Sequence, residues 1–184
     1  MNVIESSLPG VKILEPSVYR DDRGFFCESF NEARFATHGL ATSFRQDNRS
    51  HSRQGVLRGL HYQLTRPQGK LVTCVSGTVF DVAVDVRRGS PTFGEWTGVT
   101  LQSDEPRFLW IPEGFAHGFC VLSESADVVY KCTDVFEPAD DHGVLWSDPA
   151  IGIRWPIARP LLSPKDERYA GLHLGRDDLP RYSV

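Results

Sequence analysis

Short apolar runs, separated by Gly, Pro, Asp and Asn, recur along most of this chain. Many runs of this length with turn residues between them are typical of the β-strands of a sandwich or barrel. Residues 79–85 are almost continuously apolar, which predicts a central strand that is covered on both sides. The predicted strands are residues 11–14, 25–30, 42–50, 57–63, 70–76, 77–85, 95–101, 108–111, 117–122 and 127–133.

Residues 31–36 carry a helix signal instead. They include helix-forming Glu, Ala and Arg residues and are followed by Gly39, which is a common helix end. Either Asn31 or Ser29 is suited to cap the first turn. We therefore predict a short helix at this position.

A second helix signal lies near the C-terminus. Ser163 is followed by Pro164 and, three residues after the serine, by the acidic Asp166, as in a capping box. The helix that this pattern predicts should end by Gly171. Together the patterns predict one β domain spanning residues 1–184, with a short helical C-terminal tail.

Composition and charge narrow the class of protein. Of the 184 residues, 40% are hydrophobic and 24% charged, as in ordinary globular proteins, and the net charge is −4. The longest basic run is Arg87-Arg88, so nucleic acid is not an expected partner. There is no apolar stretch of about 18 residues, and the N-terminus has no secretory signal. We expect a cytoplasmic protein that does not bind membranes.

The four cysteines are Cys27, Cys74, Cys120 and Cys132, and no two of them form a CxxC pair. Each lies in an apolar, strand-like stretch. We interpret them as reduced residues of the core rather than as disulfide, metal or nucleophilic residues.

The sequence PEGFAH at residues 112–117 has the form P-x-G-x-x-H and resembles the second motif of the cupins, a jelly-roll superfamily. In metal-binding cupins the first motif supplies H-x-H, whereas here the corresponding string is His61-Tyr62-Gln63. His61 and His117 alone leave a divalent ion short of the three protein ligands that a catalytic site usually supplies. We therefore predict an all-β jelly roll, the cupin-like double-stranded β-helix, without a bound metal.

Without a metal, His61 is free to act as a base, because imidazole titrates near neutral pH. The alternative for a single histidine in a strand is a buried residue satisfied by its neighbours. Arg58, Lys70 and His117 would add cationic or hydrogen-bond-donating groups around one cavity, and such donors stabilise an enolate. Each of them taken singly is more often a solvated surface residue.

Seven strings of the sequence are distinctive. They are QDN at 46–48, GVLRGLHYQ at 55–63, QGKLV at 68–72, FDVAVD at 80–85, SPTFG at 90–94, WIPEGFAHGF at 110–119 and YKCTD at 130–134. These strings resemble the dTDP-4-dehydrorhamnose 3,5-epimerase family, and the match runs in order from about Arg23 to Asp166. The resemblance implies a dimeric jelly-roll epimerase that acts without metal or cofactor on a dTDP-4-keto-6-deoxy sugar nucleotide, in the pathway to dTDP-L-rhamnose.

The resemblance also implies individual roles. His61 matches the base, Tyr130 the acid on the opposite face of the sugar, Asp166 the carboxylate that orients the histidine, and Lys70 the group near the C4 keto oxygen. Substrate contacts are implied for Arg23, Glu28, Gln46, Asn48, Arg58, His117 and Lys165.

Chemistry supports these roles independently, because a 4-keto group acidifies the hydrogens on C3 and C5 and one base can remove either. Inversion then needs an acid on the other face. Simpler readings exist for two of the residues. Tyr130 could be an aromatic residue of the core, and Asp166 could serve only as the capping-box acid.

Two positions depart from the family pattern. Phe136 stands where a tyrosine commonly stacks on the thymine ring, and Asp141 stands where a glutamate is common. A phenylalanine still offers an aromatic face for stacking on the base. The aspartate is shorter than a glutamate and could shift a substrate contact. Both positions remain predicted substrate contacts. The departures leave open a relative that inverts only one centre or acts on another dTDP-4-keto-6-deoxy sugar. Less favoured alternatives are a metal-dependent cupin oxygenase and a non-catalytic sugar-binding jelly roll.

One expectation concerns geometry. In a regular strand, Arg58 and His61 would point to opposite faces, whereas their implied roles place both near the substrate. Either Gly59 marks a bulge that redirects one side chain, or Arg58 lies beyond the strand end.

We also predict a homodimer, in which the early strand with Arg23 and Glu28 helps to close the active site of the other subunit.

Overall fold

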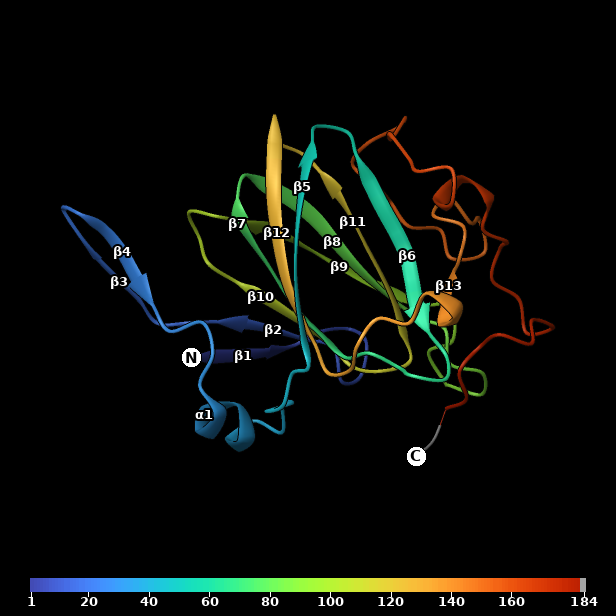
Figure 1. Ribbon diagram of the computed structural model, residues 1–184, viewed down its shortest axis with the longest axis horizontal. Coiled ribbons are helices and arrows are strands. Elements are labelled where there is room, and N and C mark those ends of the chain that lie inside the picture. The colour runs from blue at the N-terminus through green and yellow to red at the C-terminus, as the bar shows by residue number, and fades with distance from the viewer. Residues whose placement is uncertain (183–184) are drawn as a thin grey trace.

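The computed structural model describes residues 1–182, and its body consists of two facing β-sheets (Figure 1). Every ladder between its strands is antiparallel. The first sheet has the order β1 (Asn2–Glu5), β2 (Lys12–Glu15), β10 (Phe108–Ile111), β7 (Lys70–Ser76), β12 (Ser125–Cys132) and β5 (Gln46–Arg53). The second has the order β13 (Asp141–Gly143), β6 (Leu57–Gln63), β11 (Phe115–Val121), β8 (Thr78–Asp85) and β9 (Trp96–Gln102). This two-layer β architecture confirms the predicted fold class.

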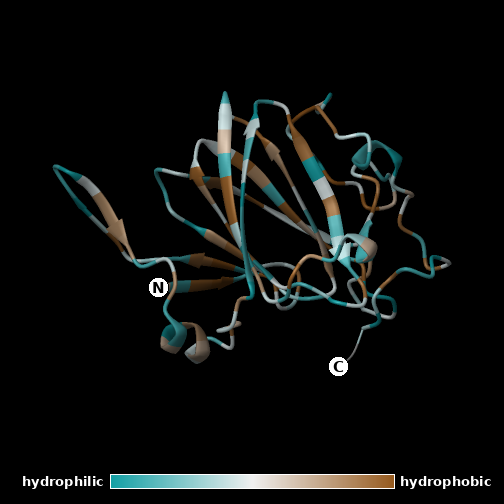
Figure 2. Cartoon of the chain, viewed as in Figure 1, coloured by the Kyte–Doolittle hydropathy of each residue, from teal (hydrophilic) through white to brown (hydrophobic). Residues whose placement is uncertain are grey.

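The main hydrophobic core lies between the two sheets. Val72 of β7 and Val128 of β12 are fully buried there, together with Phe119 of β11 on the opposite sheet. In Figure 2 brown, apolar segments lie on most strands of the two sheets, whereas β5 is mostly teal. Burial of this apolar surface is the main favourable contribution to folding.

Strand β8 is covered on both faces, as its continuous apolar sequence predicts. Val79 and Ala83 belong to the core between the sheets. Val82 and Val84 belong to a second core, formed with apolar residues of the C-terminal segment such as Leu172. In Figure 1 this segment, in orange and red, runs along the outer face of the second sheet.

The predicted N-terminal helix is confirmed as α1 (Glu32–Thr37). Asn31, rather than Ser29, caps it, because the Asn31 side chain accepts a hydrogen bond from the Arg34 backbone N–H at 3.1 Å. Phe35 is the buried residue of this helix.

The helix predicted after Ser163 is present, but it is shorter than expected and of the 3₁₀ type. The chain forms only a 3₁₀ turn, η2 (Asp166–Arg168), and Tyr169 is already extended. Ser163 does accept the Asp166 backbone N–H through Oγ, as in a helix start. The carboxylate of Asp166, however, is bonded to a distant strand, and this tertiary contact outweighs the local helix signal.

Several strand predictions were incomplete. β1, β3 (Val18–Asp21) and β13 were not predicted, and the strand expected at residues 25–30 is the shorter β4 (Gly24–Cys27). β3 and β4 pair only with each other, and this hairpin projects from the body (Figure 1). These strands have four residues or fewer, so their sequences hold too few positions to show a period.

The cysteines are free, and Cys74, Cys120 and Cys132 are buried as predicted, whereas Cys27 is only partly covered. Within residues 1–182, no helix has the length and apolar character needed to span a membrane.

A β-bulge resolves the geometry of Arg58 and His61. His61 is paired with His117 of β11, and Arg58 is paired with Phe119. Three positions on β6 therefore match two on β11, and both side chains reach the same cavity. Gly59 has a φ of +132°, and a β-carbon there would lie 2.5 Å from the Cα of Gly118.

This contact yields a stability prediction. Gly59→Ala should destabilise the protein by about 3 kcal/mol, because the added methyl group would push β6 away from β11. Gly89→Ala is the matched control: its φ of +88° also disfavours a side chain, but nothing lies within 4 Å. It should cost only about 1 kcal/mol in the free energy of unfolding measured with urea. Equal losses in the two variants would show that the strand contact is unimportant.

Candidate active site

A cavity of about 610 Å³ lies between the two sheets at one end of the body. This volume suits a ligand of the size of a small organic molecule or nucleotide. Both sheets and the C-terminal segment contribute to its walls. The polar and aromatic residues that line it are Gln46, Asn48, Ser50, Arg53, Arg58, His61, Tyr62, Gln63, Gln68, Lys70, His117, Phe119, Tyr130, Phe136, Asp141, Ser163, Lys165 and Asp166.

His61 and Asp166 form a hydrogen-bonded pair at this cavity. His61 Nε2 lies 2.6 Å from Asp166 Oδ1, and the Asp166 side chain is only 4% exposed. Burial would raise the pKa of Asp166, but the bonds from His61 and from the Ser163–Asp166 turn outweigh it and lower the pKa. The carboxylate is therefore ionised at neutral pH and fixes the imidazole in place.

A second histidine–carboxylate pair lies next to the first. His117 is the cross-strand neighbour of His61, and its Nε2 lies 2.9 Å from Asp81 Oδ1. Asp81 is completely buried, and this burial raises its pKa against the opposing effect of His117. Because β8 is paired with β11, Asp81 lies beside His117 in the sheet, and its carboxylate fixes the orientation of the His117 imidazole.

Lys70 and Tyr130 come from the opposite sheet, on the neighbouring strands β7 and β12. Burial lowers the pKa of Lys70, and within residues 1–182 no carboxylate lies within ion-pair distance of its ammonium group. Burial raises the pKa of Tyr130, although the charges of Arg58 and Lys165 oppose this rise. The phenol therefore keeps its proton at neutral pH.

The mouth of the cavity carries Phe136, Lys165 and Asp141. Phe136 is 46% exposed although it is a large apolar residue, and the Lys165 ammonium is paired with the Asp141 carboxylate at 2.5 Å. Together the walls offer a base, hydrogen-bond donors, cations and an aromatic face. This set suits a planar, anionic ligand and proton transfer next to a carbonyl group.

Comparison with known proteins identifies the family. The sequence profile of the dTDP-4-dehydrorhamnose 3,5-epimerases matches residues 5–173. The chain belongs to this family. It is 58% identical over 168 residues to the dTDP-4-dehydrorhamnose 3,5-epimerase of Shigella flexneri, covering 90% of this chain and 93% of the relative.

Two further relatives extend the comparison. The dTDP-4-dehydrorhamnose 3,5-epimerase of Neisseria gonorrhoeae is 57% identical over 167 residues, which cover 90% of this chain. This chain spans about half, 51%, of the length of that relative. A crystal structure of the epimerase from Legionella pneumophila, in complex with dTDP-4-keto-L-rhamnose, has a TM-score of 0.96 and 50% identity. The structural match covers 100% of this chain and 99% of the Legionella chain. The predicted family and the isomerase class are confirmed.

Most residues implied by the epimerase resemblance are brought together by the fold. Only Arg23 and Glu28 lie away from the cavity of this chain. Arg23 pairs with Asp21 at the exposed tip of the β3–β4 hairpin, and Glu28 pairs with Arg34 of α1. The residues that do line the cavity are His61, Tyr130, Asp166, Lys70, Gln46, Asn48, Arg58, His117, Phe136, Asp141 and Lys165.

Some residues of the epimerase site were not predicted. Gln63 lies two positions after His61 and therefore on the same face of β6, a signal that the sequence did contain. Asp81 is a charged residue inside an apolar strand, which was a second available signal. Tyr169 had no such signal. Its ring packs edge-on against the His61 ring, with 5.8 Å between the ring centroids, because the C-terminal turn folds back on β6.

Asp140 fixes the backbone where β6 leaves the cavity. Its buried carboxylate accepts the backbone N–H groups of Leu64, Thr65 and Arg66 at 3.2, 2.9 and 2.8 Å. Burial of Asp140 opposes ionisation, but these hydrogen bonds outweigh it and lower the pKa of Asp140 to about 2.

The low pKa predicts a pH-dependent contribution to stability. The ionised Asp140 should stabilise the fold by about 2 kcal/mol at pH 7, because its pKa falls from 3.8 to about 2 on folding. This contribution decreases as the pH falls below about 4 and should be about half as large at pH 3. Asp140→Asn should therefore destabilise the protein more at pH 7 than at pH 3 in urea unfolding. The exposed Asp104 provides the control, Asp104→Asn, with little effect at either pH; a pH-independent loss for Asp140→Asn would contradict the assignment.

Proposed function

We propose that this chain inverts C3 and C5 of dTDP-4-dehydro-6-deoxy-D-glucose and so forms dTDP-4-dehydro-L-rhamnose. The reaction proceeds by proton abstraction and reprotonation through an enolate and uses no metal or redox cofactor. The observation that carries this proposal is the 2.6 Å pairing of His61 with the buried Asp166 at the cavity. Membership in the epimerase family supports the same substrate.

His61 is the proposed base. Its Nε2–H donates to Asp166, so that Nδ1 carries the lone pair that takes a proton from C3 or C5. The Asp166 carboxylate then stabilises the imidazolium that forms. One base is sufficient for both centres because the C4 keto group acidifies both hydrogens.

Lys70 and Tyr130 have complementary proposed roles. The Lys70 ammonium group stabilises the negative charge that develops on the C4 oxygen, and burial strengthens this interaction because water is excluded. Tyr130 projects from the opposite sheet, and its protonated phenol delivers a proton to the other face of the enolate. Inversion follows when His61 takes one proton from the sugar and Tyr130 delivers a different proton to the opposite face. His61 then releases its proton to solvent, and the Tyr130 phenolate takes one back.

Polar residues and one aromatic ring suit the nucleotide part of the substrate. Arg58 and His117 are the cationic or donating groups that we assign to the diphosphate, with Gln46 and Asn48 beside them. Phe136 offers its ring to the base. A single-centre epimerase would use the same groups, and counting exchanged hydrogens separates the two functions.

The base assignment predicts the fate of both hydrogens. His61→Ala should lower the exchange of the C3 and C5 hydrogens with D₂O together, by roughly 10²–10⁴-fold, since one base serves both. NMR of dTDP-4-keto-6-deoxyglucose with enzyme in D₂O follows each hydrogen separately. His173→Ala, at an exposed histidine, is the matched control and should exchange like the wild type. Exchange at near-normal rates in His61→Ala would show that another group is the base.

The wild type tests the reaction itself in the same assay. Deuterium at both carbons, with conversion to the L-rhamno product, is the result expected for a 3,5-epimerase. Deuterium at one carbon only would establish the single-centre function instead, and no exchange would contradict epimerisation.

We propose further that the protein is a homodimer in which the β3–β4 hairpin reaches the partner's site. Within one chain the hairpin pairs with neither large sheet, and its residues Tyr19 and Phe26 are 65% and 68% exposed. Apolar side chains on a projecting arm favour burial against another surface. The arm also carries Arg23, which lies outside the cavity of its own chain.

A mixing experiment tests this exchange of arms. Heterodimers of Arg23→Ala with His61→Ala should regain up to about half of the wild-type activity, because one of the two sites receives both intact residues. Heterodimers of Arg23→Ala with Glu28→Ala are the matched control, because both changes lie on the arm side and neither site is restored. Equal activity in the two verified heterodimers, or a monomer by sedimentation, would contradict the exchange.

A further inference from the structure

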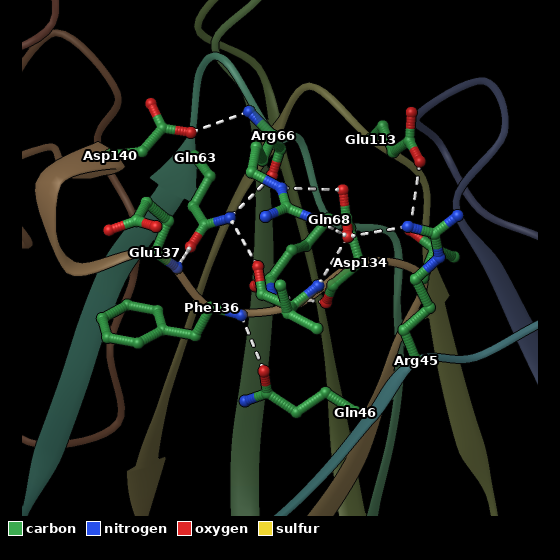
Figure 3. A network of polar contacts seen from close by, with 12 residues as sticks. Arg45, Gln46, Gln63, Arg66, Gln68, Glu113, Asp134, Phe136, Glu137 and Asp140 are labelled. Atoms are coloured by element: carbon green, nitrogen blue, oxygen red, sulfur yellow. Dashed lines mark hydrogen bonds and ion pairs between the residues drawn. The ribbon is translucent and has the colours of Figure 1, made fainter.

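Gln63 is an almost fully buried glutamine, only 4% exposed, at the end of β6. Its amide nitrogen donates to the carbonyl oxygens of Arg66 at 2.6 Å and Val135 at 3.2 Å. Its amide oxygen accepts the backbone N–H of Glu137 at 2.8 Å. As Figure 3 shows, Gln63 thus joins β6 to the segment 134–137, which lies more than 70 positions away along the chain.

Most backbone polar groups of the segment 134–137 are hydrogen-bonded within the protein. Gln68 donates to the Asp134 carbonyl oxygen at 2.8 Å, and the Asp134 carboxylate accepts the Val135 N–H at 2.8 Å. Arg66 pairs with the same carboxylate at 2.8 Å. Gln46 accepts the Phe136 N–H at 2.6 Å (Figure 3).

Phe136 stands in the middle of this segment, and its ring is the part that remains available. The backbone N–H groups of residues 135–137 already donate within the protein, so they are not available to a ligand. Phe136 as a whole residue is 46% exposed, and it lies at the edge of the cavity. A ligand that meets this segment therefore meets an apolar aromatic face held by a rigid polar frame.

We propose that Gln63 is a positioning residue that holds the Phe136 ring ready for the nucleobase of the sugar nucleotide. This inference rests on the proposed function, which supplies a nucleobase as ligand. Strand β6 also carries His61, two residues before Gln63. The same strand therefore positions the proposed base and the glutamine that holds the Phe136 loop. Both ends of the Gln63 amide are bonded to backbone groups, so we infer that it acts through the loop rather than through the substrate.

The physical reason is preorganisation. A loop that is fixed before binding does not have to be ordered by the ligand, and an ordering cost of about 1 kcal/mol or more would otherwise weaken binding. Base–aromatic stacking contributes about 1–3 kcal/mol, but only when the ring is correctly placed. Loss of the Gln63 contacts should therefore raise KM and the Kd for dTDP, while kcat at saturating substrate changes little.

A double-mutant cycle tests the inference. Gln63→Met keeps the side-chain length and removes all three hydrogen bonds, and Phe136→Ala removes the ring. Calorimetry with dTDP as the probe should show that Gln63→Met weakens binding about tenfold in the wild-type background. In the Phe136→Ala background the same change should weaken binding less than about twofold, since no ring remains to be positioned.

Thr73→Val is the matched control, because it also removes a side-chain bond to a backbone carbonyl, that of Arg107 at 2.8 Å, away from the cavity. It should not alter dTDP binding in either background. Equal losses for Gln63→Met in the two backgrounds, or a fall in kcat as large as the rise in KM, would overturn the inference. If Gln63→Met does not fold, Gln68→Met enters the same cycle, and additivity there is equally decisive.

The outcomes also separate this inference from the proposed function. A wild-type protein that binds dTDP and exchanges both hydrogens, but shows an additive cycle, retains the epimerase function and refutes only the role of Gln63. A wild-type protein that neither binds dTDP nor exchanges hydrogens refutes the function on which the inference rests.

Discussion

The close approach of Gly59 to Gly118 is the constraint on which the rest of the site depends. Only residues without a β-carbon allow β6 and β11 to pass this closely, and the bulge that results moves Arg58 to the same side as His61. A regular strand would direct one of these two side chains away from the cavity. The cross-strand pairing of His61 with His117 then places two imidazoles side by side on one wall.

Buried carboxylates hold these imidazoles in place, and the first sheet supplies the other proposed catalytic groups of the site. Asp166 comes from the C-terminal turn and Asp81 from a central strand, so each histidine is anchored by a different part of the chain. Lys70 and Tyr130 face them from the first sheet. The space between the sheets thus separates the proposed base, His61, from the proposed cation and acid, Lys70 and Tyr130, an arrangement that suits inversion.

The sequence predicts the fold well where the signal is local. The apolar run of β8 and the Asn31 cap of α1 were readable because each depends on neighbouring residues. The helix expected after Ser163 is only a 3₁₀ turn, in which the carboxylate of Asp166 bonds to a strand about a hundred residues earlier. The cavity residues were identified through family motifs. The contacts of Gln63 with backbone groups of a distant loop, and the packing of Tyr169 against His61, depend on tertiary structure and could not be predicted from local sequence.

The central claim is that Asp166 holds His61 in the tautomer whose Nδ1 accepts the substrate proton. Nitrogen-15 NMR of the protein, with the His61 signal assigned by its loss in His61→Gln, measures this tautomer directly at a pH where the imidazole is neutral. The account predicts a protonated Nε2 and an unprotonated Nδ1 in the wild type, with this preference lost in Asp166→Ala. A neutral His61 that carries its proton on Nδ1 in the wild type would contradict it.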